Sequence, residues 1–396
     1  MNKDNFFKYQ AQTTPHPLGM EISHAKGSYI FDKNEKKYLD FVAGVSACSL
    51  GHKNPLVINA IKKQLDKYLH VMVYGEYIQI PSVNLSRLIA KFLPKNIEKT
   101  YLTNSGTEAI DGALKLARRY TGRSEIFAAN QAYHGNTIGA LSVMGYEERK
   151  NPFRPLLPDI RFIDFNSMND ITKISSNTAA VILETIQGGA GFIEPKHNFL
   201  KNIQMRCNEV GALLILDEIQ PGFGRTGKVF GFENYNCVPD IVVFGKGLGG
   251  GMPIGGFSAS AKIMASLSNN PKLGHITTFG GHPVIAAAAL ATLKKITGSN
   301  LIEKTLEKER IFRSRLKHEL INEIRGKGLM LCIITKNPNI ANKLVQKASE
   351  NGLILFWLLY EPSAVRITPP LTISNNEIEE GCNIILKILD KIALEC

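Results

Sequence analysis

Lys246 lies in the segment DIVVFGKGLGGGMPIGG, residues 240–256, where an apolar run meets a series of glycines. Three of these glycines match the G-x-G-x-x-G spacing of a dinucleotide-binding turn, which must be followed by a helix. Pro253 would interrupt that helix, and no acid follows Asp240 until Glu303, so the carboxylate that holds a ribose hydroxyl is missing. A nicotinamide-dependent oxidoreductase is therefore a weak hypothesis, and Lys246 needs a different role.

The surroundings of Lys246 favour covalent chemistry with a carbonyl group. The run DIVVF is strand-like and ends just before the lysine, and we interpret the glycines as room for a planar ligand. An amine that burial can deprotonate forms Schiff bases. The ordinary alternative, a lysine on a mobile surface loop, does not explain its place at a strand end.

Two carboxylates, Asp217 and Glu218, follow the apolar run LLIL at residues 213–216. A solvated strand end explains one of the two acids. Asp217, so close to a buried run, could instead be the permanent anion that keeps a heterocyclic nitrogen protonated.

The segment TNSGTEAIDGALKLARRY, residues 103–120, predicts a helix that begins at a glycine-containing turn after a strand. Ser105 and Glu108 have the spacing of a capping box. Free amide hydrogens and the positive end of the helix favour a bound phosphate, with Ser105 and Thr107 adding hydroxyl groups. For this segment alone, an ordinary capped helix is the better interpretation. Together, however, a phosphate seat, an isolated carboxylate and a reactive lysine are what pyridoxal phosphate requires.

A fourth segment, NQAYHGNTIGALS, places Tyr133 and His134 before a glycine turn. The tyrosine could stack on a cofactor ring or could be a packing residue, and the sequence favours neither. The histidines and the six cysteines show no metal-ligand spacing, so we expect no metal site.

These residues need a scaffold, and short β-rich runs alternate with helical periodicity from residue 61 to residue 297. We expect an α/β fold with a mostly parallel sheet in a large domain, residues 51–290. Residues 1–50 and 291–396 carry further strand and helix patterns and would form a smaller α+β domain. The sheet runs are KTYLT, EIFAAN, AAVILET, GALLILDE and DIVVFG.

The composition limits partners and location. The chain has 396 residues, a hydrophobic content of 44% and a formal net charge of +12, and its basic residues are interleaved with acids. This pattern favours a solvated surface that attracts small anions over a nucleic-acid interface. No signal-peptide core and no apolar run of about 18 residues occur, so we expect no membrane association and a cytoplasmic protein with reduced thiols.

Seven motifs occur in a fixed order along the chain: SGTEA from Ser105, YHGNT from Tyr133, LDEIQPGFGRTGKVFGFE from Leu216, PDIVVFGKGLGGGMPIGG from Pro239, ITTFGGHP from Ile276, RGKGLM from Arg325 and VRITPPL from Val365. Together they resemble the class III aminotransferases, a family that includes acetylornithine, ornithine and 4-aminobutyrate aminotransferases. The resemblance runs from about Phe31 to the C-terminus.

The resemblance implies a fold type I transferase that binds pyridoxal 5'-phosphate and forms a homodimer with active sites at the subunit interface. By motif position, Lys246 would form the internal aldimine and then shuttle a proton. Asp217 would pair with the pyridine nitrogen, and Gln220 would lie near the phenolic oxygen of the ring.

The same resemblance implies the remaining cofactor contacts. Gly106 and Thr107, with Ser105 beside them, would hold the phosphate. Tyr133 would stack on the ring, and Thr278 resembles the threonine that crosses the dimer interface to the partner's phosphate.

Arg366 resembles the arginine that binds the α-carboxylate of 2-oxoglutarate or glutamate. Two departures concern the amino donor. Asn136 stands where acetylornithine and ornithine enzymes carry an arginine for the donor carboxylate. Gly189 replaces the glutamate that masks the arginine equivalent to Arg366, so Arg366 would be permanently available to an anion.

We therefore expect an aminotransferase that moves a terminal amino group from an amino acid or amine, such as acetylornithine or ornithine, to 2-oxoglutarate. A 4-aminobutyrate or other ω-amino acid transaminase, and an aminomutase or decarboxylase of the same class, stay open as alternatives. A non-catalytic binding protein agrees poorly with seven motifs. The sequence does not determine the physiological donor, the assembly beyond a dimer or the pathway.

Overall fold

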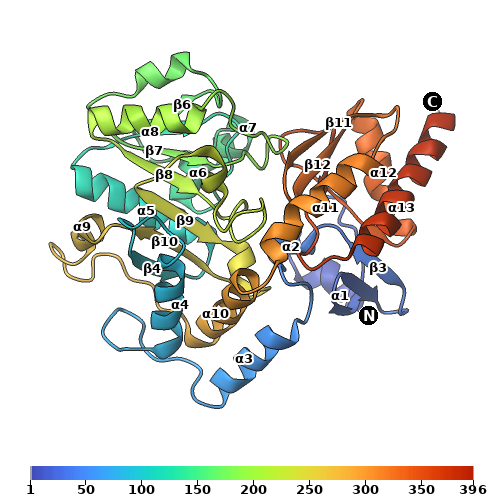
Figure 1. The fold of residues 1–396 in the computed structure, drawn as a ribbon, viewed down its shortest axis with the longest axis horizontal. Coiled ribbons are helices and arrows are strands. Elements are labelled where there is room, and N and C mark those ends of the chain that lie inside the picture. Colours follow the sequence, from blue (N-terminus) through green and yellow to red (C-terminus); the bar gives the residue numbers. More distant parts are fainter. Residues whose placement is uncertain (1, 396) are drawn as a thin grey trace.

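A seven-stranded sheet forms the centre of the larger half of the computed structural model, which describes residues 2–395 (Figure 1). In spatial order its strands are β4 (Lys99–Thr103), β10 (Gly255–Ala259), β9 (Ile241–Gly245), β8 (Leu213–Asp217), β7 (Thr178–Glu184), β5 (Glu125–Ala129) and β6 (Ile160–Ile163). Only β10 runs antiparallel to its neighbours, and the other pairs are parallel. The predicted α/β fold with a mostly parallel sheet is therefore confirmed.

The sheet is covered on both faces, which explains why its strands read as continuous apolar runs. On one face, Ile182 and Ile215 belong to a buried cluster with apolar residues of α5 (Gly106–Thr121). On the other face, Leu183 and Leu216 join a larger cluster with α8 (Phe199–Val210) and α10 (Pro283–Thr297). The alanine-rich α10 is a core helix.

The smaller half contains two four-stranded sheets. In one, β1 (Ile22–Lys26), β2 (Tyr29–Asp32) and β3 (Lys37–Asp40) are followed by β13 (Leu353–Ile354), which is parallel to β3. The other has the order β11 (Ile321–Lys327), β12 (Met330–Thr335), β15 (Ala364–Ile367) and β14 (Phe356–Trp357). Residues from both chain ends thus share a sheet, while the domain boundaries at residues 50 and 290 stay a prediction.

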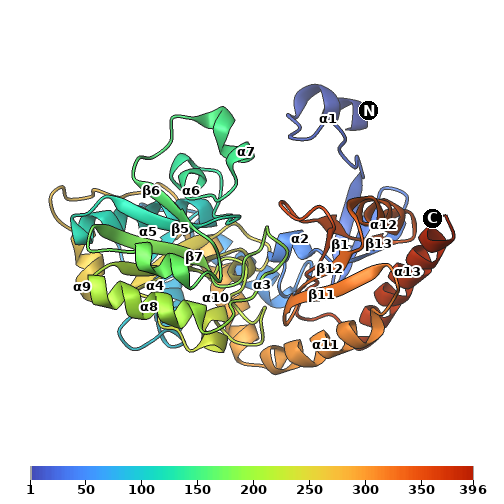
Figure 2. The same ribbon diagram turned by 90° about the horizontal axis from the view of Figure 1, so that it is seen from above.

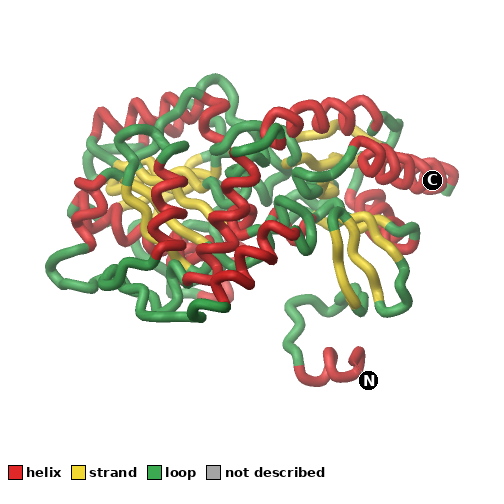
Figure 3. The backbone as a smooth tube through the Cα atoms, turned by 60° about the horizontal axis from the view of Figure 1, so that its bottom comes forward, coloured by secondary structure: helices red, strands yellow, loops and turns green. Residues whose placement is uncertain are grey.

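Helices surround the sheets, as Figure 3 shows in red. The short α1 stands apart from the rest in Figure 2 and has no buried residue. No helix of residues 2–395 is long and apolar enough to cross a membrane. The helices not yet named are α1 (Asn2–Tyr9), α2 (Ala43–Ser46), α3 (Pro55–Leu65), α4 (Ile80–Ala90), α6 (Ile138–Ser142), α7 (Glu147–Lys150), α9 (Ala261–Met264), α11 (Leu301–Arg315), α12 (Pro338–Glu350) and α13 (Asn375–Leu394).

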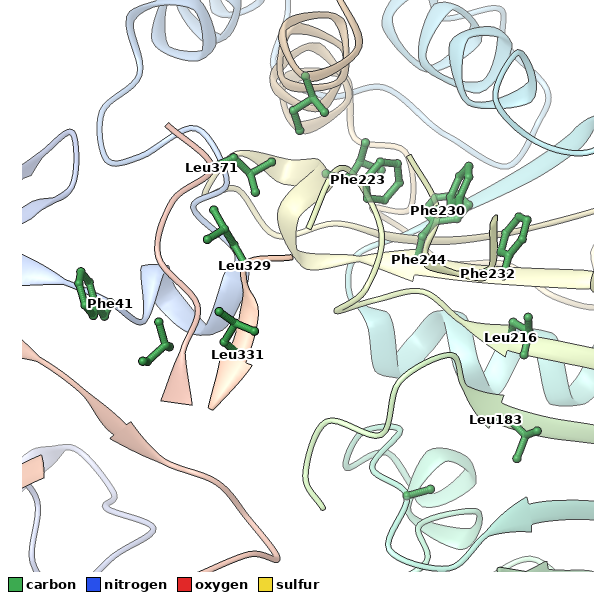
Figure 4. Packing of buried hydrophobic residues seen from close by; sticks show 14 of the residues in the cluster. Phe41, Leu183, Leu216, Phe223, Phe230, Phe232, Phe244, Leu329, Leu331 and Leu371 are labelled. Atoms are coloured by element: carbon green, nitrogen blue, oxygen red, sulfur yellow. The ribbon is translucent and has the colours of Figure 1, made fainter. Parts of the chain in front are cut away.

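One apolar cluster joins the two halves (Figure 4). Phe223 and Phe244 belong to the large half, and Leu329, Leu331 and Leu371 approach them from the small half. Burial of this surface holds the small half against the sheet. As a result, the strand that carries Arg366 has a fixed place relative to the large sheet.

Other atoms of the protein occupy the space beside two of the glycines that follow Lys246. A Cβ added at Gly247 would collide with Ser49 Oγ, and one at Gly250 would collide with Thr292 Oγ1. Gly250 also has a φ of +60°, which favours glycine. The interpretation of these two glycines as room for a planar ligand is therefore wrong, since they make room for close packing.

Candidate active site

The carboxyl ends of three strands bring the sequence-predicted residues together. β8 ends at Asp217, β9 ends just before Lys246, and β4 leads into the turn before α5. The antiparallel β10 lies between β4 and β9, so β4 and β9 run in the same direction. The lysine, the carboxylate and the helix N-terminus therefore lie at one edge of the sheet, where open α/β sheets bind ligands.

Asp217 is a buried carboxylate with fixed hydrogen bonds. It is 3% exposed, and its Oδ1 accepts a hydrogen bond from the Ile219 N–H at 2.9 Å. Its Oδ2 lies 2.8 Å from Nδ1 of His134, which is also buried. Nε2 of His134 has no hydrogen-bond partner among the described residues. Sequence reasoning gave His134 no role, because nothing in the spacing connects two residues so far apart in the chain.

Lys246 has a strained backbone and a weakened charge. Its φ of +39° is unusual for a residue with a side chain and is a mark of functional sites. Burial lowers the pKa of its amine, and the positive charge of Arg366 lowers it further, while Asp217 and Glu184 oppose the change. The side chain is only partly exposed, so the environment favours a neutral, nucleophilic amine.

The turn before α5 has the groups that a phosphate needs. Oγ of Ser105 accepts a hydrogen bond from the Glu108 N–H at 3.3 Å, which leaves the hydroxyl hydrogen free to donate. The N–H groups of Gly106 and Thr107 are in the first turn of a helix and have no intrahelical acceptor. The predicted capping box is only half formed, because Glu108 accepts from the Asn104 N–H at 2.7 Å rather than from Ser105.

The hydroxyl of Thr107 has partners inside the protein. It shares a hydrogen bond of 2.7 Å with the Thr137 hydroxyl and accepts one of 3.0 Å from the Thr137 N–H. These contacts tie the start of α5 to the loop that carries Tyr133. Thr107 can therefore offer its backbone N–H, rather than its hydroxyl, to a phosphate at this turn.

Tyr133 is partly buried beside a buried acid that sequence reasoning missed. The Tyr133 N–H donates to Glu184 Oε2 at 3.1 Å, and the Gly188 N–H donates to Glu184 Oε1 at 3.0 Å. Burial raises the pKa of Glu184 to about 7. Asn136 donates to the Tyr133 hydroxyl at 3.3 Å.

Glu218 does not lie at a solvated strand end, which was one sequence-based interpretation of the two acids. The residue is fully buried, and burial raises its pKa to about 7. Its carboxylate accepts hydrogen bonds from the Thr185 hydroxyl and from the N–H groups of Gly231 and Phe232. It therefore holds a loop of the protein and is not a group at the solvent edge.

A left-handed turn, residues 43–46, lies close to Gly247, the residue after the lysine, and was not predicted. All four residues have positive φ, including the β-branched Val45 at +58°. Asp40 holds the turn by accepting hydrogen bonds of 2.8 and 3.0 Å from two backbone N–H groups at its start. At its end, the Ser46 hydroxyl accepts a hydrogen bond of 3.4 Å from Gln220.

Arg366 is a buried cation with free hydrogen-bonding groups. It is 6% exposed, and its Nε and Nη1 have no partner in the part of the chain that the structure describes. Its guanidinium lies 5.5 Å from the ring centre of Phe192, and burial lowers its pKa to about 10. The positive charge of Arg366 also lowers the pKa of the Lys246 amine.

Thr278 does not join this group within one chain. It is exposed in the loop before α10 and makes no hydrogen bond with any other site residue that the structure describes. Its proposed role depends on a second subunit, so the single chain leaves the prediction open.

The group at the strand ends fits pyridoxal phosphate. The start of α5 could hold the phosphate, the Asp217–His134 pair could hold a protonated ring nitrogen, and Lys246 offers a neutral amine. The free buried nitrogens of Arg366 need an anionic ligand. Fold and site together define an enzyme that depends on pyridoxal phosphate.

Comparison with known proteins agrees with this class. The family described as "Aminotransferase class-III" matches residues 9–389. The chain belongs to this family and is an aminotransferase with pyridoxal phosphate as its cofactor.

Two relatives and one solved structure show the extent of the similarity. Acetylornithine aminotransferase of Clostridium acetobutylicum is 37% identical over 380 residues, which are 93% of this chain and 95% of that protein. Putrescine aminotransferase of Pectobacterium atrosepticum is 37% identical over 402 residues, with 96% of this chain and 84% of that protein covered. The crystal structure of ornithine aminotransferase from Toxoplasma gondii superposes with a TM-score of 0.91 at 30% identity, covering 100% of this chain and 96% of that one.

Proposed function

We propose that Lys246, Asp217 and Arg366 carry the transfer of a terminal amino group from an amino acid or amine to 2-oxoglutarate. The observation that carries the proposal is the Arg366 guanidinium, which is buried and has two nitrogens without a partner among residues 2–395. A buried cation is costly unless an anion pairs with it. The carboxylates of 2-oxoglutarate and glutamate supply that anion at every turnover.

Lys246 would act as the base of the reaction. Pyridoxal phosphate, when bound, supplies an aldehyde that reacts with amines and a ring that withdraws electrons from the substrate carbon. Once the substrate amine has displaced Lys246, its Nζ would take the proton from the carbon that carries the amino group. The lowered pKa of Lys246 supports this role, because a neutral amine is required to accept the proton.

Asp217 would face the ring nitrogen, and the bond to His134 would fix the direction of its carboxylate. The turn Ser105–Gly106–Thr107 would hold the phosphate, as the free N–H groups at the start of α5 support. Tyr133 would stack on the ring, and Gln220 would lie near its phenolic oxygen. These last two roles rest on the positions of the residues in the family motifs.

The position of Gly189 supports a permanently available Arg366. A Cβ added at Gly189 would lie 2.7 Å from Cε2 of Tyr360, so the ring of Tyr360 occupies the space into which a larger side chain would grow. The Tyr360 N–H also donates to the Gly189 carbonyl at 2.9 Å. Arg366 would therefore bind an anion without competition from an acid at residue 189.

A homodimer with shared active sites would complete the phosphate seat through Thr278. Large apolar side chains are exposed near this threonine and in the segment after α3, among them Leu69 at 62%, Ile78 at 90% and Phe279 at 52%. Exposed apolar groups in such numbers mark a protein interface. We propose small-molecule substrates and no nucleic-acid partner, and the cytoplasmic location stays a prediction.

The spectrum of the purified enzyme tests the assignment of Lys246. Wild-type holoenzyme should absorb in the visible, and glutamate alone should bleach that band until 2-oxoglutarate restores it. Lys246→Ala should lose the reversible bleaching, since it lacks the amine that binds the cofactor and moves the proton. Full turnover and an unchanged spectrum in this variant would show that the lysine has been wrongly assigned.

Subunit mixing tests the dimer. Lys246→Ala and Thr278→Arg should each be inactive as homodimers. In a hybrid, one site combines an intact Lys246 with an intact Thr278 from the other subunit, so mixing the refolded variants should restore activity. Absence of any recovery, with hybrid dimers demonstrated by mass, would contradict a shared site.

A further inference from the structure

A cluster of three tyrosines adjoins the proposed cofactor site. Tyr360 stacks on Tyr146 with ring centres 4.5 Å apart and an angle of 12° between the planes. Tyr133 packs against the same cluster, which also contains Leu141 and Met144. Because Tyr133 and Tyr360 are both hydrogen-bonded to the loops around Glu184 and Gly189, the cluster lies beside the site and not elsewhere on the surface.

Arg149 lies over this cluster without an acid partner. Its guanidinium is 5.8 Å from the ring centre of Tyr360, a cation–π distance. It makes no ion pair or side-chain hydrogen bond with any described residue, whereas its neighbours Lys150 and Arg154 both pair with Glu147. Of these three cations, Arg149 alone has its charge free for a ligand.

The charge of Arg149 acts on two tyrosine hydroxyls. Burial raises the pKa of Tyr133 and of Tyr360, and in both cases the positive charge of Arg149 opposes the rise. Together with the 5.8 Å contact to the ring of Tyr360, this places the cation at the tyrosine cluster. Arg149 is exposed, and so is Asn136, which donates to the Tyr133 hydroxyl.

This arrangement would favour a substrate whose far end is an anion over one whose far end is a cation. A guanidinium on an aromatic surface keeps its planar donors available for a carboxylate, which it can bind with two parallel hydrogen bonds. The same charge repels an ammonium group. A donor amine that reacts at Lys246 would extend its other end past Tyr133, toward Arg149.

We propose that Arg149 binds the anionic group at the far end of the amino donor, so that the enzyme prefers ω-amino acids to diamines. The proposal rests on the proposed function, because it needs the donor amine to react at Lys246. It makes Arg149 a specificity-determining residue, distinct from Arg366, which binds the carboxylate of 2-oxoglutarate or glutamate.

Half-reactions of the holoenzyme with 4-aminobutyrate and with putrescine test the proposal, because the two donors differ in the charge of the far end. Arg149→Met should raise the KM for 4-aminobutyrate by about ten- to a hundredfold, as expected for loss of a charged hydrogen bond, with little change in kcat. The KM for putrescine should stay the same or fall. Arg149→Glu should clearly lower the KM for putrescine. Arg149→Lys should recover part of the binding of 4-aminobutyrate that Arg149→Met loses.

Arg154→Met is the matched control, since it removes a nearby cation that is already paired with Glu147 at 2.6 Å. It should change neither KM. Parallel changes for both donors in Arg149→Met, or no change for either, would overturn the proposal.

The half-reaction with glutamate separates this proposal from the proposed function. If glutamate bleaches the wild-type enzyme and the Arg149 variants do not distinguish the donors, only the role of Arg149 is wrong. If glutamate fails to bleach the wild-type enzyme, the proposed function itself is wrong.

Discussion

Replacing Arg366 by methionine should make the protein more stable and much less able to use 2-oxoglutarate. The two effects have opposite signs because the guanidinium is buried with Nε and Nη1 unpaired. Methionine has a similar length and no charge, and its sulfur can keep the contact with the ring of Phe192.

The magnitude follows from the groups that the substitution removes. Each unsatisfied buried donor costs about 1–3 kcal/mol, and the lost cation–π contact with Phe192 offsets about 0.5–2 kcal/mol of the relief. The apoenzyme should therefore gain about 1–2 kcal/mol in its free energy of unfolding. Loss of a charged, bidentate contact with a carboxylate costs about 2–5 kcal/mol, so kcat/KM for 2-oxoglutarate should fall by about 30-fold or more.

Urea unfolding of the apoenzyme measures the first effect, and reoxidation of the amino form of the enzyme by 2-oxoglutarate measures the second. Arg325→Met is the matched control, because Arg325 already pairs with Glu323 at 2.6 Å and lies in the same sheet as Arg366, on β11, with β12 between the two strands. This control should show no gain in stability and no loss of 2-oxoglutarate use. A less stable Arg366→Met variant, or one with an unchanged kcat/KM, would refute the view that the buried charge serves a ligand.

Three further predictions concern the surroundings of the site. Burial raises the pKa of Glu184 from its ordinary 4.5 to about 7, so the native state keeps a proton that the unfolded state releases, and stability should fall between these two pH values by about 3 kcal/mol. The difference in unfolding free energy between pH 5 and pH 8, measured with urea, should be smaller for Glu184→Gln than for the wild type. Gly189→Glu should destabilise the protein through its clash with Tyr360; in combination with Tyr360→Ala the loss of unfolding free energy should be smaller than the sum of the two single losses, while the half-reaction with glutamate is weakened. Val45→Gly should raise the unfolding free energy by about 1 kcal/mol by relieving the positive φ, which calorimetry of the apoenzyme can measure.

The large sheet was predictable where its strands are long and apolar. β7, β8 and β9 are buried throughout and stand out in the sequence. β6 and β10 were missed, because β6 is a strand of four residues and β10 begins with Gly255 and Gly256. Gly255 packs on the Ser105 carbonyl, so its lack of a side chain reflects a close approach that only the folded chain reveals.

The candidate site was predictable only where a residue directly follows a strand. Lys246 and Asp217 could be found in this way, whereas His134 meets Asp217 across 83 residues of sequence. That contact depends on the order of the strands in the sheet, which local patterns do not determine. Glu218 was misjudged because its N–H still donates to the Val243 carbonyl at 2.7 Å, so the chain continues the sheet pairing beyond Asp217 and turns the next side chain into the protein.

Several features of the site that sequence patterns do not reveal have a cost in stability. Lys246 and Val45 have left-handed backbone conformations, Arg366 is buried without an acid, and Glu184 is buried beside Asp217. Propensity and hydrophobic periodicity describe what favours folding, so they give no signal at positions where folding is disfavoured. Such positions persist only where the rest of the structure holds them, as Asp40 holds the turn at residues 43–46 with two hydrogen bonds. The concentration of these costs at one edge of the sheet is therefore an argument for function that is independent of any motif.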